Sequence, residues 1–495
     1  MGLKSFLSLV FAKIIVKKNN YWKYNAVKSQ HKIFFSLLKK GNSTRFGKDH
    51  DFNGIKDYVD WKKNVPVREY EGFKEYIDLI TLGEKNVLWP GSPIYFCKTS
   101  GTTSGAKYIP ISADSLPNHL LAARDTILSY IAETKNTSIV SGKMIFLQGS
   151  PKLTKTGKIP TGRLSGIVAN HVPFYLQKNR LPSYDTNCID DWEEKIDAIV
   201  EETHSKNMTL ISGIPPWIQM YFERLQKKTG KMISDLFPNF NLFIYGGVNY
   251  LPYKKTFEKL IGAPVDGVEL YPASEGFIAY QDSQKEKGML LCVNHGIFYE
   301  FISEESFLNG SMERVSLEGV ILNENYVIIL NTNAGLWGYN IGDTIKFVSI
   351  NPYRIIVTGR VKHFTSAFGE HVIAEEVDLS MQACLEKFNV EIKEFHVAPQ
   401  VNPSEGLPFH EWFVEFITPP KSLEKFSVFL NKEMQRHNVY YNDLIVGKVL
   451  SSLKIRVVKK NGFNDYMKSV GRLGGQNKVP RLANDRKIAE KLTSL

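Results

Sequence analysis

The strongest chemical signal in the chain is a run of glycine, hydroxyl and basic residues from Lys98 to Lys107. The run contains two glycines, five serines or threonines and a lysine at each end. Glycine lets backbone N–H groups approach an anion, hydroxyl groups add donors, and lysines neutralise charge. Apolar segments at 94–97 and 108–111 flank the run. The pattern predicts a hairpin whose tip binds nucleotide phosphate, with a turn-rich hairpin that binds no ligand as the alternative.

Two carboxylates follow apolar segments that read as strands. Glu275 lies in Ala-Ser-Glu-Gly, after a strand pattern that ends near Tyr271, and Mg²⁺ prefers hard oxygen ligands that bridge it to phosphate. Asp343 closes a turn before the predicted strand 344–349, where it could accept hydrogen bonds from both ribose hydroxyls. Tyr271 offers an aromatic face for a purine. Each also has an ordinary structural interpretation: an exposed loop glutamate, a turn-capping aspartate and a packed strand-end tyrosine.

The elements that would position these groups alternate between strand and helix from residue 94 to about 348. Examples are the strand patterns at 143–147, 208–212, 241–245 and 265–270 and the helical patterns at 190–204 and 216–228. Such alternation predicts a largely parallel sheet with helices on its faces and ligands beyond the carboxyl ends of its strands. The first ninety residues have a charged, helical pattern.

The pattern changes after about residue 359. Helix, strand, strand and helix patterns follow at 374–387, 394–401, 411–417 and 422–437. We therefore predict an α/β protein of two domains. The larger N-terminal domain, residues 1–358, has mixed and parallel sheets with helices on both faces. The smaller C-terminal domain, residues 359–495, is α+β.

The composition is that of a globular enzyme. The 495-residue chain has a formal net charge of +11, and we interpret its basic residues as scattered, which argues against nucleic acid. Four widely spaced cysteines disfavour a zinc site or a disulfide framework and favour the cytoplasm. No segment reaches about 18 uninterrupted apolar residues. The apolar run 6–16 resembles a weak signal peptide without a cleavage site, and we expect a helix packed on the body.

Taken in order, these segments resemble the adenylate-forming enzymes and, more closely, the GH3 acyl acid–amido synthetase family, as a bacterial-type member. The resemblance rests on residues 99–105, 271–275, 339–343 and 359–360, with further similar pieces at 213–217, 245–253, 367–370 and 478–481. The phosphate loop alone is shared with acyl-CoA synthetases, whereas the combined set is specific. The family usually has Arg after the Tyr of its third segment, and this chain has Asn340 there, so the role of position 340 stays open.

The resemblance implies a ligase that uses ATP and Mg²⁺ to adenylate a small carboxylic acid and then transfers the acyl group to an amine, most often an amino acid. It implies catalytic roles for Lys107 and Lys478, with Lys478 on a mobile small domain, and a Mg²⁺ ligand at Glu275. It implies a nucleotide site that comprises Ser100, Gly101, Thr102, Thr103, Ser104, Gly105, Gly247, Tyr271, Pro272, Ser274, Asp343 and Arg360. The substrate pocket would include Tyr175, Pro215 and Trp217.

Several points stay open from the sequence. Arg163 or Arg180 would pair with the substrate carboxylate, and the sequence selects neither. An acyl-CoA ligase is one alternative function, although the chain after residue 359 lacks the long basic tail motif expected for CoA. A catalytically silent nucleotide-binding protein is another, although Glu275 and Lys107 are both present. We expect a monomer with no nucleic-acid partner and no membrane span.

Overall fold

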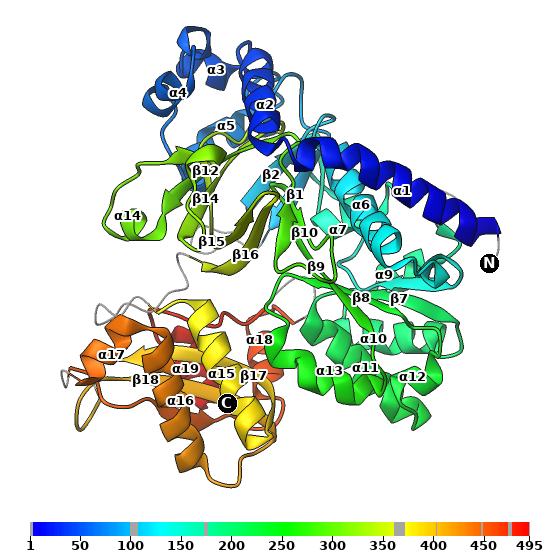
Figure 1. Cartoon of the computed structure of the whole chain (residues 1–495), viewed down its shortest axis with the longest axis vertical. Helices are drawn as coiled ribbons and strands as arrows, with labels where there is room; N and C mark the ends of the chain where they lie inside the picture. The colour runs from blue at the N-terminus through cyan, green and yellow to red at the C-terminus, as the bar shows by residue number, and fades with distance from the viewer. Residues whose placement is uncertain are drawn as a thin grey trace. The chain divides into compact units, whose positions relative to one another are not determined.

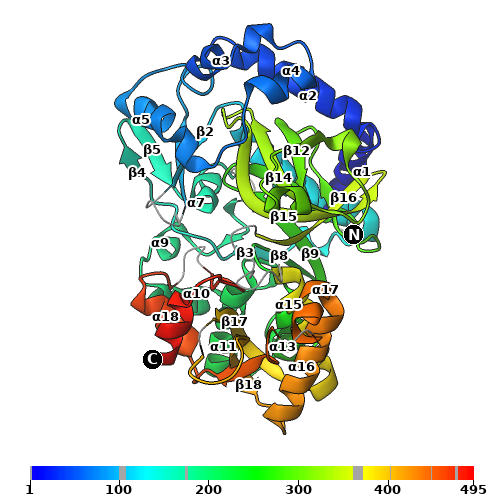
Figure 2. The same ribbon diagram turned by 90° about the vertical axis from the view of Figure 1, so that its left-hand side faces the viewer.

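The computed structural model describes residues 3–99, 107–172, 177–360, 372–401, 403–446, 449–473 and 478–494. The chain divides into two compact units, each of which can be followed in Figures 1 and 2. The first unit comprises Met1–Ile214, Arg224–Gly247 and Val265–Ile356. The second comprises Pro215–Glu223, Val248–Pro264 and Val357–Leu495. The second unit therefore combines the C-terminal part of the chain with two short segments from its middle.

Helices dominate the first ninety residues, as predicted. They are α1 (Leu3–Lys23), α2 (Ala26–Gly41), α3 (Arg45–Asp49), α4 (Tyr58–Asn64) and α5 (Lys74–Leu82). Their apolar sides meet in a core rich in aromatic rings, where Phe34 lies 5.6 Å from Trp61 and Trp61 lies 6.1 Å from Trp337 between ring centroids. Burial of these large side chains holds the helices against the strand region that carries Trp337.

A twelve-stranded mixed sheet forms the framework of the first unit. Its order is β13-β12-β14-β15-β16-β11-β10-β9-β8-β7-β3-β6. The strands are β3 (Lys143–Phe146), β6 (Arg180–Leu181), β7 (Met208–Ser212), β8 (Leu242–Gly246), β9 (Asp266–Ala273), β10 (Gly276–Tyr280), β11 (Met289–Leu291), β12 (Ile297–Ser303), β13 (Val315–Ser316), β14 (Asn325–Thr332), β15 (Tyr339–Ile350) and β16 (Tyr353–Arg360).

The predicted parallel arrangement holds for one part of this sheet only. Pairing is parallel through β9, β8, β7, β3 and β6. It is antiparallel for β9 with β10, β10 with β11, β11 with β16, and β14 with both β12 and β15. At the change from parallel to antiparallel pairing, only two residues join β9 to β10, and so short a connection can join only antiparallel strands.

Helices cover this sheet. The remaining helices of the first unit are α6 (Leu116–Thr134), α7 (Leu164–Ala169), α9 (Tyr184–Asn187), α10 (Trp192–Thr203), α12 (Ile233–Leu236) and α14 (Glu304–Leu308). Leu128 and Ile131 of α6 pack with Leu210, Leu242 and Ile244 of the parallel strands. Figure 1 shows α10 on the other side of β7 and β8 from α6. The predicted α/β class with helices on both faces is therefore confirmed.

A separate four-stranded sheet, of order β2-β1-β5-β4, contains the predicted hairpin. Its strands are β1 (Tyr95–Thr99), β2 (Lys107–Ile111), β4 (Thr154–Thr156) and β5 (Ile159–Gly162). β1 and β2 pair antiparallel from Tyr95 opposite Ile111 to Thr99 opposite Lys107. The strand–turn–strand prediction is therefore correct for both arms of the hairpin.

The second unit is built around a three-stranded sheet, β17 (Glu391–Gln400), β18 (Phe409–Thr418) and β19 (Lys454–Val457), in that order. Its helices are α13 (Lys254–Ile261), α15 (Ala374–Phe388), α16 (Leu423–His437), α17 (Val439–Val446), α18 (Gly462–Ser469) and α19 (Lys487–Ser494), together with the start of α11 (Pro215–Thr229). The predicted helix–strand–strand–helix order is observed. Nowhere in the described ranges is a helix both long and apolar enough to cross a membrane.

Candidate functional site

The arms of the glycine-rich hairpin end at Thr99 and Lys107. The predicted phosphate-binding residues Ser100, Gly101, Thr102, Thr103, Ser104 and Gly105 lie outside the described residues. Lys107 stands at the base of the hairpin, with its Nζ 5.6 Å from the ring centroid of Tyr70. The Tyr70 hydroxyl also accepts a hydrogen bond from the backbone N–H of Tyr108. The base of the hairpin is therefore held against the helical N-terminal region.

Glu275 lies in the two-residue turn that joins β9 to β10, because Ala273 pairs with Gly276. The Cys97 thiol of β1 donates to the Ser274 hydroxyl at 3.0 Å, which joins this turn to the strand that leads into the hairpin tip. Burial raises the pKa of Glu275, and the negative charge of Asp343 adds to that shift. A hydrogen bond from Tyr339 and the positive charge of Lys107 oppose it.

Asp343 meets Tyr271 across 72 residues of sequence. The Tyr271 hydroxyl donates to an Asp343 carboxylate oxygen at 2.6 Å. Asp343 is buried and lies within β15, in an irregularity of its pairing with β14, rather than in a turn before the strand as predicted. Gly342 adopts a φ of 85°, and its N–H donates to the Asn340 side chain at 2.8 Å. Asn340 therefore shapes the backbone that presents Asp343.

Lys107, Glu275, Tyr339, Asp343 and Tyr271 thus form one interacting group in the first unit. The sequence patterns predicted four of these residues as site residues and did not include Tyr339. Tyr339 is the first residue of the family-like segment 339–343, and that position could have identified it. A Mg²⁺ ion bound through one carboxylate and substrate phosphates needs only one such ligand. Among the described residues, no three His, Cys, Asp or Glu side chains gather into a metal cluster. Glu275 fits that single-carboxylate type of magnesium site.

The last residue of β8 and the residue after it are both glycines. A Cβ at Gly246 would lie 2.3 Å from the carbonyl oxygen of Leu270, so only glycine fits there. The next residue, Gly247, has a φ of 82°, in the left-handed region that favours glycine. Pro272, in β9, is exposed. These features agree with a close backbone approach at the strand ends.

The remaining predicted residues lie in other segments of the chain. Arg360 ends β16, Pro215 begins α11, Trp217 is buried in α11, and Lys478 is exposed. All four belong to the second unit. Tyr175 lies outside the described residues. Their predicted roles stay predictions.

The structure distinguishes the two arginines that the sequence left equivalent. β5 pairs parallel with β1, with Cys97 opposite Gly162, so Arg163 follows at the edge where β1 leads into the predicted phosphate loop. A Cβ at Gly149 would lie 2.8 Å from Cδ of Arg163, so this glycine makes room for the side chain. Burial lowers the pKa of Arg163. Within the described part of the chain, no carboxylate forms an ion pair with Arg163.

Arg180 has different surroundings. It lies in β6, the last strand of the large sheet, and its Nη1 donates to the Ala169 carbonyl at 3.0 Å. Its guanidinium also lies 6.0 Å from the ring centroid of Phe146. Arg180 therefore has local partners of its own, whereas Arg163 lies half-buried beside β1 and Cys97.

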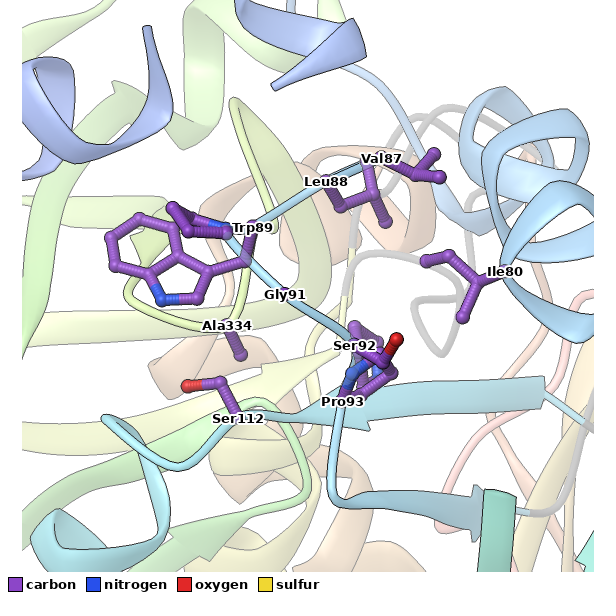
Figure 3. Close-up of a pocket in the computed structure, with 11 residues that line it drawn as sticks. Ile80, Val87, Leu88, Trp89, Gly91, Ser92, Pro93, Ser112 and Ala334 are labelled. Carbon is purple, nitrogen blue, oxygen red and sulfur yellow. The ribbon is translucent and has the colours of Figure 1, made fainter. Parts of the chain in front are cut away.

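A small pocket, drawn in Figure 3, lies elsewhere in the first unit. Its lining includes Ile80, Leu88, Trp89, Ser112 and Ala334. None of the predicted site residues lines it. It is therefore separate from the group around Glu275.

Comparison with known proteins identifies the family of the chain. The GH3 family N-terminal, central and C-terminal domains match residues 17–189, 290–360 and 375–487, which together make up well over half of the chain. A jasmonoyl–L-amino acid synthetase of Nicotiana attenuata is 21% identical over 539 residues, covering 92% of this chain and 91% of that protein. An indole-3-acetic acid-amido synthetase of Arabidopsis thaliana is 23% identical over 563 residues, covering 94% and 90%.

Solved structures show the same fold. The GH3.15 acyl acid amido synthetase superposes with a TM-score of 0.79 at 16% identity, covering 97% of this chain and 95% of that one. A 2-hydroxyisobutyryl-CoA ligase superposes with a TM-score of 0.60 at 13% identity, covering 94% and 92%. The family predicted from the sequence is therefore confirmed: the chain belongs to the GH3 family of acyl acid amido synthetases.

Proposed function

We propose that this GH3 protein uses ATP and Mg²⁺ to adenylate an apolar carboxylic acid and then transfers the acyl group to an amino acid. The observation that carries this proposal is the group formed by Lys107, Glu275, Asp343 and Tyr271 at the base of the glycine-rich hairpin. The acid class follows from the names of the relatives, which act on jasmonate and indole-3-acetate.

In the first half-reaction, a carboxylate oxygen attacks the α-phosphorus of ATP, and pyrophosphate leaves. Two anions must meet, so positive charge has to surround them as charge develops. Lys107 and the hairpin N–H and hydroxyl groups supply part of it. Magnesium, when bound at Glu275, would neutralise phosphate charge. Asp343 would accept hydrogen bonds from the ribose, and the Tyr271 ring would flank the adenine.

Arg163 would hold the carboxylate of the acid during this step. One carboxylate oxygen would accept from the guanidinium while the other attacks phosphorus. The position of Arg163 beside Cys97, at the same sheet edge as the hairpin, supports this role. Tyr175, Pro215 and Trp217 would line the apolar part of the acid pocket.

In the second half-reaction, the amine attacks the acyl carbon and displaces AMP. We propose that residues 359–495 act as a mobile domain that carries Lys478 to the first half-reaction and withdraws it for the second. Arg360, at the start of this domain, would reach the ribose. We further expect a bacterial-type, monomeric, cytoplasmic enzyme.

The proposal is tested by release of pyrophosphate and AMP from ATP with a panel of aryl, indole and fatty acids. Each acid is supplied with pooled amino acids or with CoA, because a CoA ligase would produce a thioester and need no amine. The double variant Thr103→Ala/Lys107→Ala should lose adenylate formation while keeping its fold. Undiminished turnover in that variant, or no pyrophosphate with any acid, would contradict the proposal.

A further inference from the structure

Helix α1 is apolar on two opposite sides, and the structure gives a partner to one of them. Ala12 and Ile15 pack with Leu128 and Ile131 of α6 in a buried cluster. Figure 1 shows α1 running alongside α6 in the first unit. The expectation that the N-terminal apolar run forms a helix packed on the body is therefore confirmed.

The opposite side of α1 presents large apolar side chains to solvent. Phe6 is 56% exposed, Val10 41% and Ile14 58%, and their spacing of four residues places them in one stripe. Leu7, Phe11 and Tyr21 are exposed as well. Large contiguous apolar patches on a protein surface mark protein or membrane interaction sites, so this exposed stripe is a candidate interaction surface.

The N-terminal region that contains this stripe carries basic residues and no acidic ones. Residues 1–48 contain ten lysines and one arginine and no aspartate or glutamate, and the remainder of the chain carries 51 basic and 51 acidic residues. The whole net charge of +11 therefore resides in the first 48 residues. Our interpretation of the basic residues as scattered is wrong in this respect.

Some of these lysines are neutralised by other elements and some are not. Lys23 pairs with Asp282, and Lys40 pairs with Asp114. Lys4, Lys13, Lys17 and Lys18 of α1 form no ion pair with any described residue. Lys32 of α2 extends the basic surface, because its Nζ lies 3.5 Å from the Tyr21 hydroxyl.

We propose that α1 docks the protein on the surface of an anionic lipid bilayer. A helix with an apolar stripe bordered by lysines lies in the plane of the interface, with the stripe in the acyl boundary and the ammonium groups at the headgroups. Anionic lipids attract such a surface. A second copy of the chain is a poorer partner, because pairing two α1 surfaces would bring their lysines together. Docking leaves the bilayer unspanned and does not depend on the proposed enzymatic activity.

The test is co-sedimentation of the full chain with vesicles of neutral phosphatidylcholine or of phosphatidylcholine mixed with phosphatidylglycerol. The wild-type chain should sediment with the anionic vesicles and be released by high salt. Phe6→Gln/Val10→Gln/Ile14→Gln and Lys13→Glu/Lys17→Glu should each weaken the partition at least about tenfold. Val59→Gln, at a 70% exposed position of α4, and Lys425→Glu/Lys432→Glu of α16 are matched controls and should bind like wild type.

The variants change exposed residues, so their thermal unfolding midpoints should match that of the wild type. If the apolar variant unfolds, the charge variant alone tests the proposal. Absence of wild-type sedimentation with anionic vesicles would overturn the proposal, as would equal binding to neutral vesicles or retained binding by both variants. A wild-type dimer in light scattering that becomes a monomer in the apolar variant would instead identify a second copy as the partner.

Discussion

Replacement of Arg163 by glutamine is the sharpest test of how the acid is recognised. The change keeps a polar side chain, removes the charge and shortens the side chain by about two bonds. In the structure, Arg163 is half-buried at the end of β5, and within the described residues it has no carboxylate partner. Its charge is therefore available to a bound anion.

The magnitude follows from the kind of bond that is lost. A hydrogen bond to a charged group contributes about 1.5–3 kcal/mol, which corresponds to a loss of about 10- to 150-fold in kcat/KM for the acid. Stability should change by no more than about 0.5 kcal/mol, because no described ion pair is broken. Arg163→Lys keeps the charge but loses the planar fork, so its activity should be intermediate.

The assay is acid-dependent exchange of pyrophosphate into ATP, which reports the first half-reaction without the amine. kcat/KM for the acid should fall in Arg163→Gln while KM for ATP stays within about twofold. Arg180→Gln is the matched control, because Arg180 already donates to the Ala169 carbonyl. The reasoning is refuted if the acid dependence is unchanged or if Arg180→Gln loses as much. A loss seen only in KM for the amino acid would assign Arg163 to the acceptor instead.

Four further substitutions test three predicted site residues and one partly buried carboxylate of β9. Glu275→Gln should raise the Mg²⁺ concentration for half-maximal pyrophosphate release at least about tenfold; an unchanged magnesium titration would remove Glu275 as a ligand. Tyr271→Phe deletes only the hydroxyl that donates to Asp343, and KM for ATP should rise about two- to tenfold with the acid dependence unaltered. Burial raises the pKa of Glu269 to about 7, so its charged form destabilises the fold at higher pH. Glu269→Gln should therefore stabilise the protein by about 1–3 kcal/mol at pH about 8.5 and by little at pH about 5 in urea unfolding; equal gains at both values would contradict this origin. Lys478→Ala should lose at least about 10²-fold in adenylation yet convert a supplied acyl adenylate to amide at nearly wild-type rate. Equal failure with the supplied adenylate would mean that Lys478 acts in the second step or in holding the closed domain.

Local sequence patterns were sufficient for the elements that carry the site. Short apolar segments on each side of a glycine-rich run predicted both arms of the β1–β2 hairpin. The prediction of Glu275 at a strand end is confirmed, because the turn residues Ser274 and Glu275 interrupt an apolar pattern that resumes in β10. Hairpins and turns depend on neighbouring residues, so a sequence window contains most of the information that they need.

The sequence did not determine which distant elements meet. The hydrogen bond between Tyr271 and Asp343 and the contact between Cys97 and Ser274 join residues 72 and 177 positions apart. The proposal of Arg163 over Arg180 rests on the parallel pairing of β1 with β5. A mixed sheet was predicted, but only the structure shows which of its strands pair antiparallel. Apolar periodicity predicts that one side of a strand or helix is buried, but it does not predict which element packs against that side. The two apolar sides of α1 illustrate this limit. Only tertiary packing decides which element becomes the partner. The hydrophobic effect is not directional, so burial against any apolar surface of suitable shape is favourable.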